Sequence, residues 1–235
     1  MLLWLMLGEA MQLEAVVDAA SAAARAAGQL IVEAGPEQRA VASTKANAKD
    51  LLTATDLASQ DLIQSVLASR CPEIDFLGEE GGVEKPLDNC WVVDPIDGTT
   101  NFVDGLPLSV VSIAYAREGE TLAGVVYDPF RDELFAGARG RGATVTSGPR
   151  KNRRPLAVSA AERLEDAIVF AGAPPNPLSL APSLRGIAAL APRVRTLRLL
   201  GSAALMLAYV ADGRGAAYFE PDLAPWDTAA GALLA

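Results

Sequence analysis

The stretch Trp91–Phe102, with the sequence W-V-V-D-P-I-D-G-T-T-N-F, constrains this chain more than any other. Its apolar start is typical of a buried strand, and two carboxylates follow at Asp94 and Asp97. Pro95 fixes its own φ and biases the preceding residue to an extended conformation, which favours a turn between the carboxylates. We therefore expect Asp94 and Asp97 to converge on cations at the end of a strand.

A Gly-Thr-Thr turn comes directly after the two carboxylates. Gly98 permits close backbone approach, and the amides of Gly98 and Thr99 are suited to hold a phosphate if a helix begins there. The Thr99 hydroxyl is a candidate for binding metal or orienting water. Two cations about 3.5–4 Å apart would activate a water molecule and stabilise a leaving oxygen. The alternative, that both carboxylates only cap a turn, is less favoured because six consecutive residues suit a site.

One competing chemistry uses an aspartyl-phosphate and the pattern Asp-x-Asp-Gly-Thr, with the nucleophile two residues before the second aspartate. Pro95 occupies that position here, so the nucleophile is absent and water is the favoured attacker.

The chain contains no histidine among its 235 residues. This excludes Ser-His-Asp triads, phosphohistidine intermediates and histidine-ligated metal centres. Oxygen ligands remain, and they favour hard cations such as Mg²⁺ or Mn²⁺. The formal net charge of −9 argues against direct binding of nucleic acid. It does not argue against a phosphorylated small molecule, because bound cations reverse the local charge.

Length and a hydrophobic content of 51% indicate one domain over residues 1–235, built from two packed halves at roughly 12–150 and 151–235. Cys71 and Cys90 lack metal-ligand spacing and are expected to be reduced thiols in a cytoplasmic protein. Residues 1–7 are apolar but lack a basic flank and are broken by Gly8-Glu9, so neither a signal peptide nor a membrane span is predicted. Met11 is an alternative start, which would make residues 1–10 an extension.

Apolar spacing predicts alternating helices and strands. We expect helices over 12–34, 57–67, 178–190, 201–210 and 225–235, with Pro182 interrupting the third. We expect strands over 74–77, 109–116, 122–127, 133–136, 167–171, 194–199 and 216–219, and a loop or extended segment over 45–52. Thr55 or Asp56 is the expected N-cap of the second helix. An antiparallel meander with covering helices indicates an α+β or layered α/β fold.

Residues 139–154 hold six basic side chains among glycine, proline and serine. A solvated hairpin loop is the favoured interpretation. A rim that attracts anionic substrates is the alternative.

The segment from Asp94 to Phe102 resembles the signature of the inositol monophosphatase family of metal-dependent, lithium-sensitive phosphatases. Three further segments match in the right order: Leu52–Asp56 resembles the family's upstream segment, Gly78–Glu80 its glutamate motif, and Trp226–Gly231 its Trp-Asp motif. The resemblance extends from about residue 12 to the end of the chain. It implies a layered α-β-α-β-α sandwich with mixed, largely antiparallel sheets, commonly as a homodimer.

The resemblance also implies roles for individual residues. A first metal would be bound by Glu79, Asp94, the Ile96 carbonyl and Thr99, a second by Asp94, Asp97 and Asp227, and a weaker third with help from Glu79. Asp56 and Thr99 would form a proton relay beside the attacking water. Phosphate would contact the amides of Gly98 and Thr99, and the alcohol portion would contact Ser202, Ala203, Glu220 and Asp227.

From the residues alone, Glu220 is equally well explained as the end of a surface strand, and Asp227 as a helix N-cap. Family members usually continue past the Trp-Asp motif through another strand and helix, and Asp104 stands where many have histidine. We expect little effect of Asp104 on the chemistry.

The expected function is Mg²⁺-dependent hydrolysis of inositol monophosphate or a similar small polyol phosphate, and the sequence Thr100-Asn101-Phe102 favours the inositol branch. Fructose 1,6-bisphosphate, histidinol phosphate and NADP are alternative substrates. A non-catalytic role is the other alternative, because some bacterial relatives act as partners of the transcription machinery.

Overall fold

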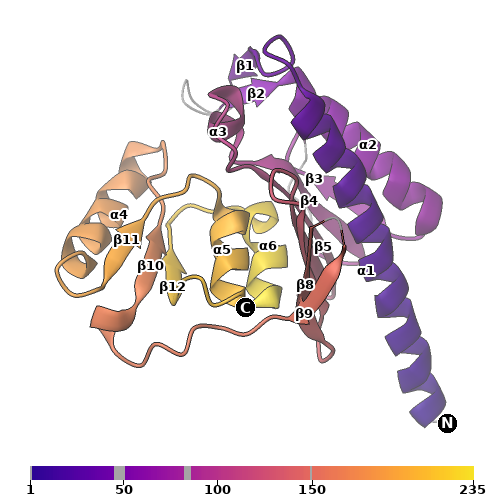
Figure 1. The fold of residues 1–235 in the computed structure, drawn as a ribbon. Coiled ribbons are helices and arrows are strands. Elements are labelled where there is room, and N and C mark those ends of the chain that lie inside the picture. The colour runs from indigo at the N-terminus through magenta and orange to yellow at the C-terminus, as the bar shows by residue number, and fades with distance from the viewer. Residues whose placement is uncertain (1, 45–50, 82–85, 149) are drawn as a thin grey trace.

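The computed structural model describes residues 2–44, 51–81, 86–148 and 150–235. Its elements stack in the order α-β-α-β-α (Figure 1), with a large sheet between two helix pairs and a small sheet between α5 and α4. This confirms the expected layered sandwich. Most of the segment predicted as a loop over 45–52 lies outside the described residues, as does Gly82.

A seven-stranded sheet forms the centre of the molecule. Its order is β3-β4-β5-β6-β7-β8-β9, and only the β3–β4 pair is parallel. The strands are β3 (Asp75–Gly78), β4 (Cys90–Asp97), β5 (Val110–Arg117), β6 (Glu120–Asp128), β7 (Glu133–Ala138), β8 (Gly142–Ser147) and β9 (Asn152–Pro155). The meander predicted after the Asp94 motif is therefore confirmed.

Helices α1 (Leu2–Glu33) and α2 (Ala54–Arg70) cover one face of this sheet (Figure 1). The alanine-rich face of α1 packs on the sheet through buried Ala20, Ala23 and Ala27, because small side chains allow close approach. The segment Gln12–Glu33 is long and apolar enough to cross a membrane. Its buried face explains that composition as packing against the sheet. A two-stranded ribbon, β1 (Val41–Thr44) and β2 (Leu51–Thr53), connects the helices.

The other face of the sheet is covered by α5 (Ala203–Ala211) and α6 (Pro225–Leu234). Beyond them lies a parallel sheet with the order β11-β10-β12. Its strands are β10 (Ile168–Ala171), β11 (Thr196–Arg198) and β12 (Ala217–Phe219), preceded by a short turn of 3₁₀ helix at Leu164–Asp166. Helix α4 (Pro177–Leu190) forms the outermost layer.

Two local expectations are wrong. Residues 139–154 do not form only a solvated loop, because β8 and β9 extend the large sheet. They also lie four and five strands from β4, at the opposite edge from the Asp94 motif. Pro182 does not interrupt α4. It lies close to the helix start, so its missing N–H leaves only one early carbonyl without its helical partner.

Candidate metal and phosphate site

Strand β4 is buried along its whole length, and its alternation decides where the carboxylates point. Trp91 and Val93 face the core under α1 and α2, whereas Cys90 and Val92 face α5 and α6. A strict alternation of sides would send Asp94 and Asp97 to opposite faces.

A bulge in β4 resolves this conflict. Asp94 is opposite Ser112 and Asp97 is opposite Val110, so β4 has one more residue than β5 over this interval. The bulge includes Pro95, which has no N–H to donate to the ladder. Ile96 consequently falls on the α1 side, in the same core as Trp91. Asp97 returns to the side of Asp94, and the Asp94 Oδ1 accepts a hydrogen bond from the Ile96 N–H at 3.0 Å.

Gly98 begins the turn into the short helix α3 (Thr99–Val103) with a φ of 91°. A Cβ at this position would lie 3.0 Å from the Leu108 carbonyl oxygen and 3.1 Å from that of Gly201. Both the left-handed backbone and the crowding require glycine here. A helix does begin directly after Gly98, which is the condition under which the amides of Gly98 and Thr99 suit a phosphate.

Asp56 reaches the same turn from α2. It lies at the third helical position, and Thr53 is the N-cap, so the prediction of Thr55 or Asp56 as the cap is wrong. The Asp56 Oδ2 accepts hydrogen bonds from the Thr53 N–H, at 2.8 Å, and from the Thr53 hydroxyl. This reciprocal box fixes the carboxylate. Its Oδ1 lies 3.4 Å from the Thr99 hydroxyl, which also lies 3.1 Å from the Ile96 carbonyl oxygen.

Asp97 is held by the N-terminal end of α5, more than a hundred residues later in the chain. The Ala204 N–H donates to its Oδ2 at 2.8 Å, the Ala203 N–H donates to its Oδ1 at 3.2 Å, and the Ser202 hydroxyl donates to Oδ2. Burial raises the pKa of Asp97 to about 6, against these hydrogen bonds, which lower it, and with a contribution from the charge of Glu79.

Asp227 completes the cluster from the first turn of α6. Its Oδ2 accepts a hydrogen bond from the Ala224 N–H at 2.6 Å. Burial, followed by the charge of Asp97, raises the pKa of Asp227 to about 7, and Glu79 and Glu220 add to the shift. One oxygen from each of Asp94, Asp97 and Asp227 lies within 4.8 Å of the others.

Glu79 lies beside this cluster, directly after β3. Its N–H donates to the Val93 carbonyl oxygen at 3.0 Å, which anchors the loop to β4. The next residue is held by Gln60 of α2, whose amide group bonds both the N–H and the carbonyl of Glu80 at 3.0 and 2.8 Å. Glu79 is therefore placed near the three aspartates, but it is not part of the 4.8 Å group.

Glu220 follows β12 and accepts a hydrogen bond from the Tyr218 hydroxyl at 2.6 Å. Burial raises the pKa of Glu220, and the bond from Tyr218 opposes that shift. The charge of Glu220 is among the causes that raise the pKa of Asp227, so Glu220 belongs to the surroundings of the cluster.

Two buried polar residues were not identified as site residues from the sequence. The Asn101 side chain donates to the Leu108 and Leu200 carbonyl oxygens at 3.0 and 2.7 Å, and so ties α3 to the turn before α5. The Ser112 hydroxyl donates to the Trp226 carbonyl oxygen at 3.1 Å and ties α6 to β5. Asn101 was part of the recognised motif, but nothing in the sequence indicates its distant partners.

The residues present fit a divalent cation. Clustered buried carboxylates repel one another as long as no cation compensates their charge, and this repulsion contributes to the raised pKa values of Asp97 and Asp227. An all-oxygen set is the one that Mg²⁺, Mn²⁺ and Ca²⁺ prefer. Asp94, Asp97 and Asp227 form the single such cluster within the described ranges.

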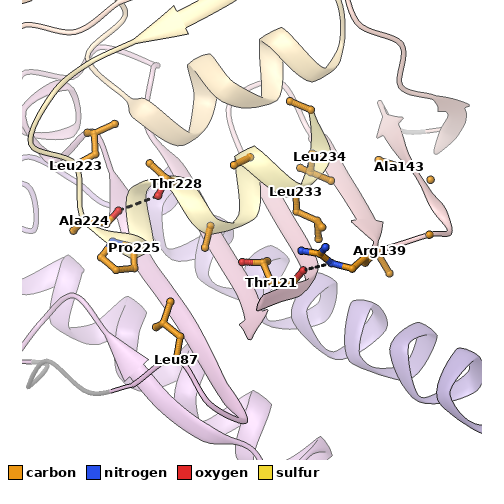
Figure 2. A pocket seen from close by; sticks show the side chains of 16 residues that line it. Leu87, Thr121, Arg139, Ala143, Leu223, Ala224, Pro225, Thr228, Leu233 and Leu234 are labelled. Atoms are coloured by element: carbon orange, nitrogen blue, oxygen red, sulfur yellow. Dashed lines mark hydrogen bonds between the residues drawn. The ribbon is translucent and has the colours of Figure 1, made fainter. Parts of the chain in front are cut away.

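One cavity lies apart from the carboxylates. It has a volume of about 800 Å³ and lies along the outer side of α6, between Leu87, Arg139 and Ala143 (Figure 2). Its lining is mostly apolar and includes no carboxylate side chain. Arg139 is its only charged lining residue, and the Arg139 side chain donates to the Thr121 carbonyl oxygen at 3.1 Å. The chemistry of this cavity does not suit cations, so we assign the candidate site to the carboxylate cluster.

Comparison with known proteins agrees with the layered fold. The model of the inositol monophosphatase family matches residues 12–235. The Nus factor SuhB of Pseudomonas aeruginosa is 39% identical over 235 residues, which cover 94% of this chain and 82% of that protein. The inositol-1-monophosphatase of Rhizobium meliloti is 40% identical over 191 residues, 79% of this chain and 68% of that protein.

A solved structure gives the same result. The extragenic suppressor protein SuhB from Bartonella henselae superposes with a TM-score of 0.83 at 37% identity, covering 94% of this chain and 83% of the other. The chain belongs to the inositol monophosphatase family. The resemblance seen in the four sequence motifs is therefore confirmed.

Proposed function

We propose that this protein is a Mg²⁺-dependent phosphomonoesterase that hydrolyses inositol monophosphate or a similar small polyol phosphate. The convergence of Asp94, Asp97 and Asp227 in a member of this family carries the proposal. The inositol-1-monophosphatase name of the Rhizobium relative supports the choice of substrate.

In this proposal the carboxylates of Asp94, Asp97 and Asp227 hold two cations, with Glu79 and the Ile96 carbonyl as further ligands and Glu79 assisting a third ion. Mg²⁺, or Mn²⁺ in its place, would supply Lewis-acid chemistry that activates water and neutralises phosphate charge. Asp97 is already oriented by the start of α5, so the chain presents its oxygens in a fixed arrangement.

Asp56 and Thr99 are proposed as the proton relay. Because Oδ2 of Asp56 is bonded to Thr53, its Oδ1 is the oxygen that faces the Thr99 hydroxyl. A proton leaving the attacking water would pass to the Thr99 Oγ1 as the Thr99 proton moves to Asp56 Oδ1. Removing either residue breaks this route.

Substrate contacts are proposed at the turn after β4 and at the ends of α5 and β12. The amides of Gly98 and Thr99 would hold phosphate, and Ser202, Ala203, Glu220 and Asp227 would face the alcohol portion. Ser202 and Ala203 both donate to Asp97 in this structure, so their position depends on that carboxylate.

A substrate panel tests the function. Inositol 1-phosphate, fructose 1,6-bisphosphate, histidinol phosphate and NADP are assayed for phosphate release with Mg²⁺, with Mn²⁺ and with a chelator. We expect inositol 1-phosphate to be the best substrate and the chelator to abolish release. Asp94→Asn should lower kcat/KM at least a hundred-fold, since it removes a proposed metal ligand. The exposed Asp61→Asn is the matched control and should remain fully active.

Metal-independent release, or activity that survives Asp94→Asn, would contradict the metal-dependent mechanism. A stronger preference for one of the other three esters would keep the mechanism and change the substrate.

A binding role with the transcription machinery is the second candidate, favoured by the Nus factor name of the Pseudomonas relative. Purified RNA polymerase would be passed over immobilised Asp94→Asn protein and over the wild type. Retention by both would support this role. Retention no stronger than on an unrelated protein of similar charge would exclude it.

A further inference from the structure

The carboxylate of Glu220 occupies a space that exists because residue 172 is glycine. Strands β10 and β12 are parallel, with Ala171 opposite Phe219, so Gly172 and Glu220 follow at the same edge of the sheet. The Gly172 N–H donates to the Phe219 carbonyl oxygen at 3.1 Å and fixes this alignment. A Cβ on Gly172 would overlap the Glu220 carboxylate. Any other side chain at position 172 would therefore displace Glu220.

Tyr218, which lies within β12, fixes the same carboxylate by a hydrogen bond. It precedes Glu220 by two residues, so both side chains leave the chain on one side. Its ring packs against the core beneath α5, and its hydroxyl donates to the Glu220 Oε2 at 2.6 Å. Burial raises the pKa of Tyr218, and the bond to Glu220 raises it further, so the hydroxyl stays a donor. The bond joins a neutral donor to a charged acceptor, which is one of the stronger kinds.

The remaining oxygen of Glu220 is left as an acceptor. No residue that the structure describes donates a hydrogen bond to its Oε1, and the charge of Glu220 acts on Asp227, whose pKa it helps to raise. A fixed acceptor beside the carboxylate cluster loses little side-chain freedom when a donor binds to it. It also discriminates strongly, because a ligand without a donor leaves a half-buried carboxylate oxygen unpaired.

We propose that Gly172 and Tyr218 are positioning residues that hold Glu220 as the acceptor of a substrate hydroxyl. The site then selects phosphate esters whose alcohol portion carries a further hydroxyl group. This inference rests on the proposed function, because an alcohol portion reaches Glu220 only if the phosphate lies at the carboxylate cluster.

Two variants test the proposal through independent contacts. Tyr218→Phe removes only the hydroxyl that bonds Glu220. Gly172→Ala adds a methyl group that displaces the end of a flexible side chain, so the fold can accommodate it. Tyr209→Phe is the matched control, because Tyr209 is a buried tyrosine of α5 whose ring packs on Phe170 and Phe135. Thermal melting of all three variants checks folding.

The first measurement compares inositol 1-phosphate with p-nitrophenyl phosphate, which has no second hydroxyl. We expect both variants to lower kcat/KM for inositol 1-phosphate roughly ten-fold, chiefly through KM, and to leave p-nitrophenyl phosphate unchanged. The control should match the wild type on both esters. An equal loss on both esters, or no loss in either variant, overturns the proposal.

The second measurement separates this inference from the proposed function. Calorimetry gives the dissociation constants of inositol 1-phosphate and of inorganic phosphate with Mg²⁺ present. If the wild type hydrolyses neither ester, the proposed function fails, and the ratio of the two constants still decides the inference. The ratio is the dissociation constant of inorganic phosphate divided by that of inositol 1-phosphate. If this ratio falls about ten-fold in both variants, the result supports positioning by Gly172 and Tyr218. An unchanged ratio, or equal affinity for the two ligands in the wild type, refutes it.

Discussion

At the scale of single residues, the chemistry is concentrated in Asp97 and Asp227. Each is a buried carboxylate with a raised pKa, about 6 and about 7, and burial is the largest cause for both. Three hydrogen bonds from the start of α5 oppose the rise in the pKa of Asp97, whereas one hydrogen bond, from Ala224, opposes the rise in the pKa of Asp227. The charge of Asp97 is the second-largest cause of the raised pKa of Asp227, so the two carboxylates hold their charges at each other's expense.

These shifts predict how the stability of the metal-free protein depends on pH. A carboxyl group whose folded pKa is raised binds its proton more tightly in the folded state. Its contribution to stability is complete below the unfolded pKa, near 4, and is lost as pH rises through the folded pKa. We therefore expect the melting temperature with a chelator to fall between pH 5 and pH 8. Saturating Mg²⁺ should remove most of this fall, since cations bind the charged form.

Scanning fluorimetry at half-unit pH steps measures both curves. Asp227→Asn removes one of the two groups and should be more stable than the wild type at pH 8 without metal, by on the order of 1 kcal/mol. It should show a weaker response to Mg²⁺. A metal-free melting temperature that rises from pH 5 to pH 8 would contradict the assignment.

At the scale of elements, close approach between α6 and β6 sets the position of Asp227. A Cβ on Gly124 would lie 2.8 Å from the Ala230 carbonyl oxygen and 3.0 Å from its Cα. Both atoms are backbone, so a larger residue must move the helix. Ser112 bonds the first turn of α6 to β5, which makes the helix a rigid carrier of its carboxylate.

Gly124→Ala should therefore weaken metal binding. We expect the Mg²⁺ concentration for half-maximal activity to rise about ten-fold, because a shift of α6 withdraws Asp227 from Asp94 and Asp97. Gly137→Ala is the control: Gly137 lies opposite Gly124 on β7 and would meet Ala143 instead of α6. Similar Mg²⁺ dependence in the two variants would show that the position of α6 does not control the site.

At the scale of the whole molecule, a partly buried charge network joins the large sheet to the layers beyond it. Arg214 forms two hydrogen bonds with Glu133 of β7, at 2.6 and 2.7 Å, and one with Asp212 after α5, at 2.8 Å. Asp212 in turn binds Arg154 of β9. The Arg214 guanidinium also lies 4.4 Å from the centre of the Tyr209 ring. This network holds α5, and with it the support of Asp97, in register with the sheet.

Arg214→Met should lower the free energy of unfolding by about 3 kcal/mol, because Glu133 loses its ion pair with Arg214 and Asp212 keeps only its pair with Arg154. Urea denaturation measures the change. Arg139→Met, which removes an exposed pair with Glu120 at 3.7 Å, should cost less than about 1 kcal/mol. Equal losses would show that the Arg214 network contributes no more than a surface pair.

The strands and helices of the chain were largely predictable, because periodic apolar residues define them locally. The exceptions are informative. Residues 139–154 were interpreted as a polar loop because most of this segment lies at the edge of the sheet, where β9 is exposed and few apolar side chains are needed. Thr53 was missed as the α2 cap because Thr55 and Asp56 are equally good cap residues by type. The roles assigned to individual site residues stay predictions.

The sequence alone determined which atoms are available to the site. A chain without histidine that places two aspartates before a Gly-Thr-Thr turn offers oxygen ligands, and this preference depends on residue type and not on geometry. Tertiary structure decided which of those oxygens meet. The bulge at Pro95 brings Asp94 and Asp97 to one face, α6 adds Asp227, and α5 orients Asp97. The contacts with α5 and α6 join residues more than a hundred positions apart, and only packing of the layers brings them together.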